Sequence, residues 1–285
     1  MTLTHDDYMV AWICALPLEL AAAKAMLDEI LPSLLQPKSE HNAYTHGRIS
    51  DHNVVVACLP SGVYGTISAS AVVSHLVSTY PNIRFGLVVG VGGGVPSESA
   101  DIRLGDVVVG KPTATSPAYS GSLNKPPTVL LKALAQMEAD SVLGKSSSVT
   151  GFQATYDHVR TEPTCSLCDQ NQLVRRPTRG TEEPYIHYGV IASGDQVIKD
   201  AKTRDLVARE RDILCFEMED AGLMDELPSL AIRGICDYCD SHKNKQWQEY
   251  AALSAAACAK SLLSIVPVWR LNSQRSVRPA YEACF

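Results

Sequence analysis

Short apolar runs alternate with helix-like segments along most of this 285-residue chain, and that alternation constrains the fold more than any other feature. The run Tyr8–Ala15 predicts a buried strand, and residues 18–30 predict a helix with Pro17 in its first turn. Further strands are expected over residues 44–49, 53–59, 85–91, 106–110, 185–192, 213–216 and 230–235, and further helices over residues 67–79, 128–139, 203–211, 221–227 and 246–266. Strands that alternate with helices indicate an α/β domain with a largely parallel sheet covered on both faces.

A chain of this length can form one large domain or two small ones, and because it shows no internal repeat and no convincing linker, a single domain over residues 1–285 is predicted. The core is expected within residues 8–266. Residues 141–179 are polar and rich in turn formers, which predicts an irregular excursion with little core of its own. The tail after Pro267 is expected to be loose.

The charge balance excludes some classes of partner. The formal net charge is -6 and the pI is about 5.7, so there is no basic excess to bind a nucleic acid or an anionic membrane surface. The sequence shows no signal-peptide pattern and no apolar run near the roughly 20 residues that span a membrane. A cytoplasmic protein that acts on a small molecule is therefore expected.

The nine cysteines are an odd number scattered through apolar runs, which predicts buried thiols rather than disulfides. Two pairs have Cys-x-x-Cys spacing, Cys165 with Cys168 and Cys236 with Cys239. The pairs lie much further apart than the roughly 15–20 residues of a zinc ribbon, so a zinc site is not expected. Nothing else in the sequence requires a metal or an organic cofactor.

Acidic residues stand beside apolar runs, where an unpartnered charge is costly. Glu217 and Glu219 follow the run that ends at Phe216, and Asp237 ends the run that begins at Ile232. Two interpretations stay open for Glu217 and Glu219. They belong to a site that stabilises a cationic transition state, or they are charges that favour a helix start.

Glu19 is open to the same helix-start interpretation, because it follows a strand at the beginning of the first helix. The glycine-rich run at residues 90–94 lacks the spacing of a Walker or Rossmann loop. It either lets a ligand approach the backbone closely or forms a tight turn.

Six short segments form a recognisable series along the chain: Trp12–Glu19, Gly90–Gly94, Gly105–Val109, Ile191–Asp195, Phe216–Glu219 and Ile232–Asp237. In this order and spacing they resemble the superfamily of purine nucleoside phosphorylases and methylthioadenosine nucleosidases, and most closely its fungal branch. The similarity covers most of the chain. It implies a three-layer α/β/α fold around a mixed, partly barrel-like central sheet, and cleavage of the N-glycosidic bond of a nucleoside.

The resemblance also implies roles for individual residues. Asp237 matches the general acid that acts on the purine at N7, Glu219 the acid that binds the ribose 2′-hydroxyl, and Glu19 the carboxylate near the attacking water. Such carboxylates stabilise the oxocarbenium-like sugar electrostatically. The implied substrate contacts are Met218 on the sugar, Val91 and Gly92 near the sugar and the nucleophile, and Val197 and Ile198 at the base.

Water is the implied nucleophile. Phosphorylases of this superfamily usually hold phosphate with an arginine before the glycine run, but residues 87–90 contain no arginine and Glu19 would repel phosphate. The predicted activity is therefore that of a nucleoside N-ribohydrolase that releases a purine base and ribose. A phosphate-dependent purine nucleoside phosphorylase is the alternative enzyme.

Two departures from the family pattern keep a third alternative open. Residues 113–122 form a shorter segment than the loop that lines the pocket in relatives, and Val197 stands where nucleosidases place an aromatic residue. A nucleoside-binding signalling module without turnover would share the same motifs. Because relatives commonly form dimers or larger assemblies, a homo-oligomer is expected.

Overall fold

The computed structural model describes residues 3–63, 65–97, 99–111, 126–141, 165–179, 183–194 and 196–268. Its strands are β1 (Val10–Cys14), β2 (Glu29–Leu31), β3 (Tyr44–Ile49), β4 (His52–Cys58), β5 (Phe85–Gly94), β6 (Val107–Gly110), β7 (Ile186–Ser193), β8 (Ile213–Glu217) and β9 (Ser229–Asp237). Its α-helices are α1 (Pro17–Met26), α2 (Thr66–Thr79), α3 (Thr128–Ser141), α4 (Ala201–Arg211), α5 (Asp220–Met224) and α6 (Gln248–Ile265). The predictions for residues 113–122, for most of the polar excursion and for the tail lie outside the described residues.

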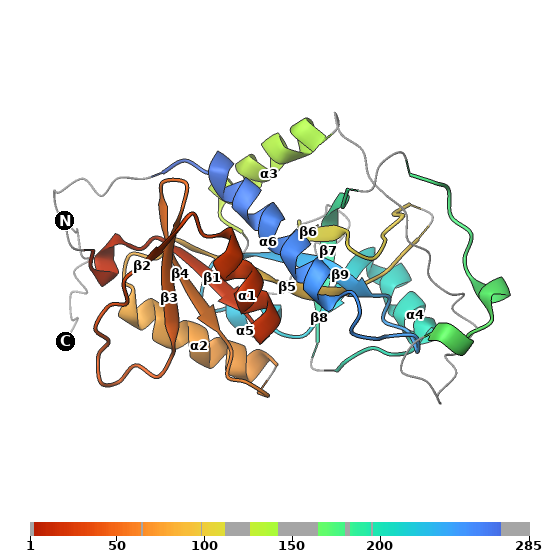
Figure 1. Cartoon of the computed structure of the whole chain (residues 1–285), viewed down its shortest axis with the longest axis horizontal. Coiled ribbons are helices and arrows are strands. Elements are labelled where there is room, and N and C mark those ends of the chain that lie inside the picture. Colours follow the sequence, from red (N-terminus) through yellow and green to blue (C-terminus); the bar gives the residue numbers. More distant parts are fainter. Residues whose placement is uncertain are drawn as a thin grey trace, which may run out of the picture.

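All of these strands belong to one sheet, part of which closes on itself (Figure 1). Five strands form a barrel in the order β5, β8, β7, β6 and β9, because β9 pairs back onto β5. Strand β5 pairs with β1 over residues 85–88 and with β8 at residues 93–94, so it belongs both to the open sheet and to the barrel. Parallel and antiparallel pairs are mixed, as β6 shows with β7 and β9. The mixed, partly barrel-like sheet is confirmed, and the largely parallel sheet is corrected.

Helices cover both faces of the sheet. Trp12 faces a core shared with Ile232 and helix α6, whereas its neighbour Ile13 faces a second core shared with Val73 on α2. Strand β1 is apolar at every position because both of its faces are buried. Figure 1 shows α1 and α6 side by side over the sheet, with α2 and α5 together elsewhere on it. The three layers are therefore confirmed. No helix in the described residues combines the length and apolar character that a membrane crossing requires.

The first helix is shorter than predicted. It ends at Met26, and Glu29–Leu31 forms an edge strand in place of its last turn. Leu27 already has an extended backbone, and Asp28 N–H donates a hydrogen bond to Arg48 O at 2.8 Å. Antiparallel pairing with β3 satisfies the backbone here, which shows that tertiary contacts outweigh local helix propensity.

Strand β9 carries a bulge where it leaves the barrel. Its register with β5 passes from Gly92 opposite Ile235 to Gly93 opposite Asp237, so Cys236 has no partner on β5. A bulge bends the strand that carries the extra residue and re-aims the side chains that follow it. Asp237 therefore enters the site from a bent strand end.

The described end of the polar excursion is anchored by two arginines. Arg176 lies over the Tyr238 ring, 5.2 Å from its centroid, and pairs with Asp101 at 3.3 Å. Arg179 donates from both terminal nitrogens to Asp106, each at 2.9 Å. This segment therefore packs against the barrel next to the end of β9.

Candidate active site

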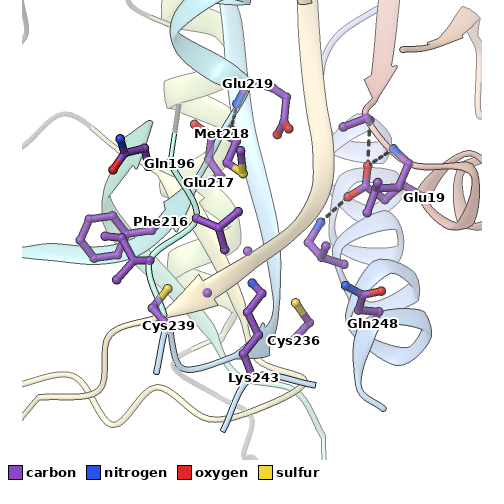
Figure 2. Close-up of a pocket in the computed structure, with 17 residues that line it drawn as sticks. Glu19, Gln196, Phe216, Glu217, Met218, Glu219, Cys236, Cys239, Lys243 and Gln248 are labelled. Atoms are coloured by element: carbon purple, nitrogen blue, oxygen red, sulfur yellow. Dashed lines mark hydrogen bonds between the residues drawn. The ribbon is translucent and has the colours of Figure 1, made fainter. Parts of the chain in front are cut away.

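A cavity of about 190 Å³ opens where α1, the end of β5, the β8–α5 junction and the segment after β9 meet. Figure 2 shows Glu19 on one side, Gln196 and Phe216 on the opposite side, and Glu219 and Met218 between them. Its mixture of apolar and polar groups is typical of a small-molecule site. The described lining residues are Ala15, Leu16, Glu19, Val91, Gly92, Gly93, Gln196, Val197, Ile198, Phe216, Glu217, Met218, Glu219, Cys236, Cys239, Lys243 and Gln248.

Glu19 lies in the first turn of α1 and is 3% exposed. Its Oε2 accepts hydrogen bonds from the N–H groups of Ala15 (2.8 Å) and Leu16 (2.9 Å), and its Oε1 accepts one from Val91 N–H at 2.7 Å. Burial raises the pKa of Glu19, against the opposing effects of Arg233 and these three donors. The carboxylate stabilises the helix start and also lines the cavity, so the two interpretations of Glu19 are compatible.

Glycines of β5 leave the space that site side chains occupy. A Cβ atom on Gly90 would collide with Glu19 Oε1 and would lie 2.6 Å from Arg233 Nη1. A Cβ atom on Gly93 would collide with Cys239 Sγ. The run continues β5 to Gly94, so the tight-turn interpretation was wrong. The glycines permit close approach, here by side chains of the protein itself.

Arg233 is the cation that interacts with the buried carboxyl groups of Glu19, Glu217, Glu219 and Asp220, and no role for it was predicted from the sequence. It lies on β9, is 1% exposed, and donates to Glu217 Oε2 at 2.8 Å and to Asp220 Oδ1. The same Glu217 oxygen accepts the N–H groups of Glu219 (2.8 Å) and Asp220 (3.0 Å). Burial raises the pKa of Asp220 well above its usual range, although Arg233 opposes the rise. Glu217 therefore fixes the β8–α5 junction, and Arg233 compensates the buried charge.

Glu219 brings a carboxyl group with a perturbed pKa to the cavity. It precedes α5 and is 8% exposed. Burial raises the pKa of Glu219 to about 7, Glu217 and Glu19 contribute further, and Arg233 opposes. A strongly shifted carboxyl in a cavity is a candidate functional group. Met218 lines the cavity beside it.

Asp237 lies one layer behind the cavity wall. Its Oδ1 accepts the Cys239 N–H at 2.9 Å. Its Oδ2 accepts hydrogen bonds from the Lys243 ammonium at 2.7 Å and from the Cys236 thiol at 3.2 Å. Among the described residues, these three neighbours line the cavity and Asp237 does not.

The segment after β9 curls back to bring Lys243 to this position. Asp237 accepts the N–H of Cys239, and Asp240 Oδ1 accepts the N–H of His242 at 2.9 Å. Such bonds to the backbone two residues on are typical of tight turns. Cys239 has a φ of 53°, in the left-handed region that few non-glycine residues adopt. The result is a short coil that folds Lys243 onto Asp237.

The structure brings seven of the eight predicted site residues to one cavity and places Asp237 directly behind it. The seven are Glu19, Glu219, Met218, Val91, Gly92, Val197 and Ile198. Of these Val197 is 43% exposed, which puts it at the rim. Among the residues of the site for which no role was predicted are Arg233, Phe216, Lys243, Gln196 and Gln248. Arg233 and Phe216 stood inside the motif segments and carried a usable signal, whereas the other three did not.

The described part of the chain contains no group of three or more His, Cys, Asp or Glu side chains arranged to hold a metal ion. Its eight cysteines are free thiols.

Known proteins of similar sequence and structure identify the family. The phosphorylase superfamily model matches residues 10–267. A nucleotide-binding leucine-rich repeat (NLR)-like protein of Hyaloscypha variabilis is 42% identical over 97% of this chain, which spans 31% of that relative's length.

Solved structures show the same fold. A 5′-methylthioadenosine/S-adenosylhomocysteine nucleosidase from S. pneumoniae with a transition-state inhibitor has a TM-score of 0.60 and 18% identity, covering 91% of this chain and 100% of that one. A Borrelia burgdorferi protein described as the same kind of nucleosidase, bound to adenine, has a TM-score of 0.64 and 18% identity, with coverage of 90% and 100%. With its matching motifs, sheet and cavity, the chain belongs to the phosphorylase superfamily.

Proposed function

We propose that this chain is a purine nucleoside N-ribohydrolase, which uses water to release a free base and ribose. The observation that carries the proposal is the meeting of the buried carboxyl groups of Glu19 and Glu219 at one cavity with Met218. Adenine and a transition-state inhibitor are bound in similar structures of the family, which supports a purine nucleoside as the substrate class.

The carboxyl groups match the charge that develops in the reaction. Breaking the bond to the base leaves an oxocarbenium-like sugar, and preorganised carboxylates stabilise that cation. Glu219 binds the ribose 2′-hydroxyl, and Glu19 accepts the proton of the attacking water. Phe216 provides an aromatic side chain on the same side of the cavity as Gln196, the residue before Val197, and the base is held there.

The charges around the cavity favour water over phosphate. Among the described lining residues Lys243 is the one cation, and it is paired with Asp237. Arg233 is held by Glu217 and Asp220. A phosphate dianion near Glu19 would meet carboxylates without a free arginine fork to bind it.

A nucleoside panel tests the proposal. Adenosine, inosine, guanosine and 5′-methylthioadenosine are incubated with the protein with and without phosphate, and chromatography detects the free base and the sugar product. We expect base and ribose at the same rate in both conditions. Base release that requires phosphate and yields ribose-1-phosphate would establish the phosphorylase alternative.

The NLR-like relative gives the second candidate its support. In a protein about three times as long as this chain, the domain could sense a nucleoside without cleaving it. Calorimetry with adenosine and with adenine separates the two functions. Nucleoside binding at saturating protein with no base formed after prolonged incubation would establish the nucleoside-binding signalling module and overturn hydrolysis.

The oligomeric state, the cellular compartment and the domain organisation of the chain are further proposals. Family resemblance supports a homo-oligomer, and the free thiols of the described core are compatible with the reducing cytoplasm. Residues 1–285 are proposed to act as a single domain. Light scattering on the purified protein measures the assembly directly.

A further inference from the structure

Lys243 brings its ammonium group to the base side of the cavity. Its Nζ lies 2.7 Å from Asp237 Oδ2, and its side chain is 29% exposed whereas that of Asp237 is 3% exposed. Figure 2 shows the Lys243 side chain between Cys236 and Cys239, with its nitrogen directed toward the cavity. A base in the cavity would meet the ammonium before it met the carboxylate.

The hydrogen bonds of Asp237 indicate which neighbouring group can supply a proton to a bound base. Its two oxygens accept from the Cys239 N–H, the Lys243 ammonium and the Cys236 thiol. All three of these groups are donors to Asp237, and the Lys243 ammonium is the charged donor among them, so it is the group that offers a transferable proton to the cavity. Burial acts to lower the pKa of Lys243, but the charge and hydrogen bond of Asp237 raise it, and the net direction is upward.

The other groups around this pair leave its charge balanced. Burial raises the pKa of the Cys236 and Cys239 thiols, which keeps both neutral. Further back, Asp240 lies near Asp237 and faces His242 and Arg204 of α4. The ammonium is therefore the group on this side that is both charged and in contact with the cavity.

We propose that Lys243 is the general acid for the departing base and that Asp237 is its positioning residue, an inference that rests on the proposed hydrolase function. As the bond from C1′ to the base breaks, its electron pair stays with the base. One N–H bond of the ammonium breaks, the proton moves to a nitrogen of the base, and a neutral amine is left beside Asp237. Water bonds to C1′ and gives its proton to Glu19, and exchange with solvent restores both groups.

This assignment reverses the role that family resemblance gives to Asp237, and two variants of Lys243 test it. Lys243→Met removes the charge and the proton, whereas Lys243→Arg keeps the charge paired with Asp237 but cannot release a proton at working pH. We expect kcat for adenosine to fall by roughly 10²–10⁴-fold in Lys243→Met, the range for loss of general acid catalysis, and to fall in Lys243→Arg also. Lys245→Met, an exposed lysine two residues on, is the matched control and should match the parent.

Substrates with different leaving groups separate proton donation from other roles. The substrate 4-nitrophenyl riboside has a leaving group that needs no proton, so both Lys243 variants should cleave it within about tenfold of the parent. Equal losses on adenosine and on the aryl riboside would overturn the assignment. If the parent protein cleaves neither substrate, the proposed function itself is wrong.

The pH profile of Asp237→Asn completes the test. Because Asp237 raises the pKa of Lys243, its loss should move the alkaline limb of kcat to lower pH while turnover persists at neutral pH. A variant with no turnover at any pH, beside an active Lys243→Arg, would show that Asp237 is the acid. Circular dichroism checks that each variant is folded. If Lys243→Met does not fold, the comparison of Lys243→Arg with the parent still tests the assignment.

Discussion

The proposed sugar side of the cavity, around Glu219, and the proposed base side, around Lys243, differ in how their charges are compensated. On the sugar side four buried carboxyl groups influence the single cation Arg233: those of Glu19, Glu217, Glu219 and Asp220. On the base side the carboxylate of Asp237 has an ammonium of its own, from Lys243. The same strand, β9, carries both Arg233 and Asp237.

This difference in charge agrees with the charges that develop on the sugar and on the base in the proposed reaction. An excess of carboxyl groups around one arginine leaves the sugar side short of positive charge, which an oxocarbenium-like sugar would supply. Burial is the main cause that raises the pKa of Glu219 to about 7, and the neighbouring carboxyl groups of Glu217 and Glu19 add to the rise against Arg233. On the base side the Lys243 ammonium and the Asp237 carboxylate balance each other before the reaction, so this side has no excess of either charge.

The largest effect should come from removing the sugar-side cation. Arg233→Met leaves Glu217 and Asp220 buried without their partner. We expect the free energy of unfolding to fall by about 3–5 kcal/mol and nucleoside cleavage to be lost. Urea unfolding measures the change, with the exposed Arg209→Met as control. A loss below about 1 kcal/mol would mean that the carboxyl groups are neutral and that the contrast between the sides is false.

Glu219→Gln should reduce kcat/KM by roughly 10²–10³-fold, as expected when one transition-state contact is removed. The carboxylate form is the active one and its pKa is about 7, so kcat/KM of the parent should rise with pH through about 7. Rate measurements from pH 5 to 9 test both points, with the exposed Glu226→Gln as control. An unchanged acid limb in Glu219→Gln would assign that limb to another group.

The same substitution should stabilise the protein at alkaline pH. Because the pKa of Glu219 is raised from 4.5 to about 7 on folding, its contribution to stability is fully present below pH 4.5 and is lost as pH rises through about 7. Glutamine avoids the cost of the buried charge, so stability at pH 8 should rise by up to about 3 kcal/mol. Asp237→Asn should instead lower stability by about 1–3 kcal/mol, because it leaves the partly buried Lys243 ammonium without its partner. Thermal unfolding at pH 5 and pH 8 compares the two.

The smallest effects on stability should come from substituting the β5 glycines that leave space for side chains of the site. Gly90→Ala places a methyl group against Glu19 and Arg233, and Gly93→Ala places one against Cys239. Each should cost about 1–3 kcal/mol of stability, as overpacked sites do. Gly194→Ala has no heavy atom within 4 Å of the added carbon and should stay within about 0.5 kcal/mol of the parent. Equal stability of all three variants would show that the site relaxes freely around β5.

The sequence predicted the elements and the site best where local signals and motifs coincided. The apolar run at β1 and the segment around Met218 were both recognisable, and most predicted contacts line the cavity. The edge strand β2 was missed because its pairing with β3 comes from residues distant in sequence. The hydrophobic pattern of a short segment does not show which distant strand it will pair with.

The charge partners could not be predicted for a similar reason. Arg233 stood in a motif segment, but its contacts with Glu217 and Asp220 depend on how β8 and β9 meet the barrel. The turn that brings Lys243 to Asp237 includes Cys239 in a left-handed conformation. Cysteine rarely adopts this conformation, so the turn could not be predicted from the residue type. Sequence therefore predicted the carboxyl groups, whereas the structure supplied the cations that set their chemistry.

The bulge at Cys236 has a consequence for how this domain can change in length. Arg233 and Asp237, which contact residues that line the cavity, are four residues apart on β9, and Cys236, which has no partner on β5, lies between them. A one-residue deletion between Arg233 and Asp237 would either remove the bulge or shift Asp237 out of its register with Gly93. We therefore expect the domain to tolerate insertions and deletions in the loops outside residues 233–237 better than within that interval.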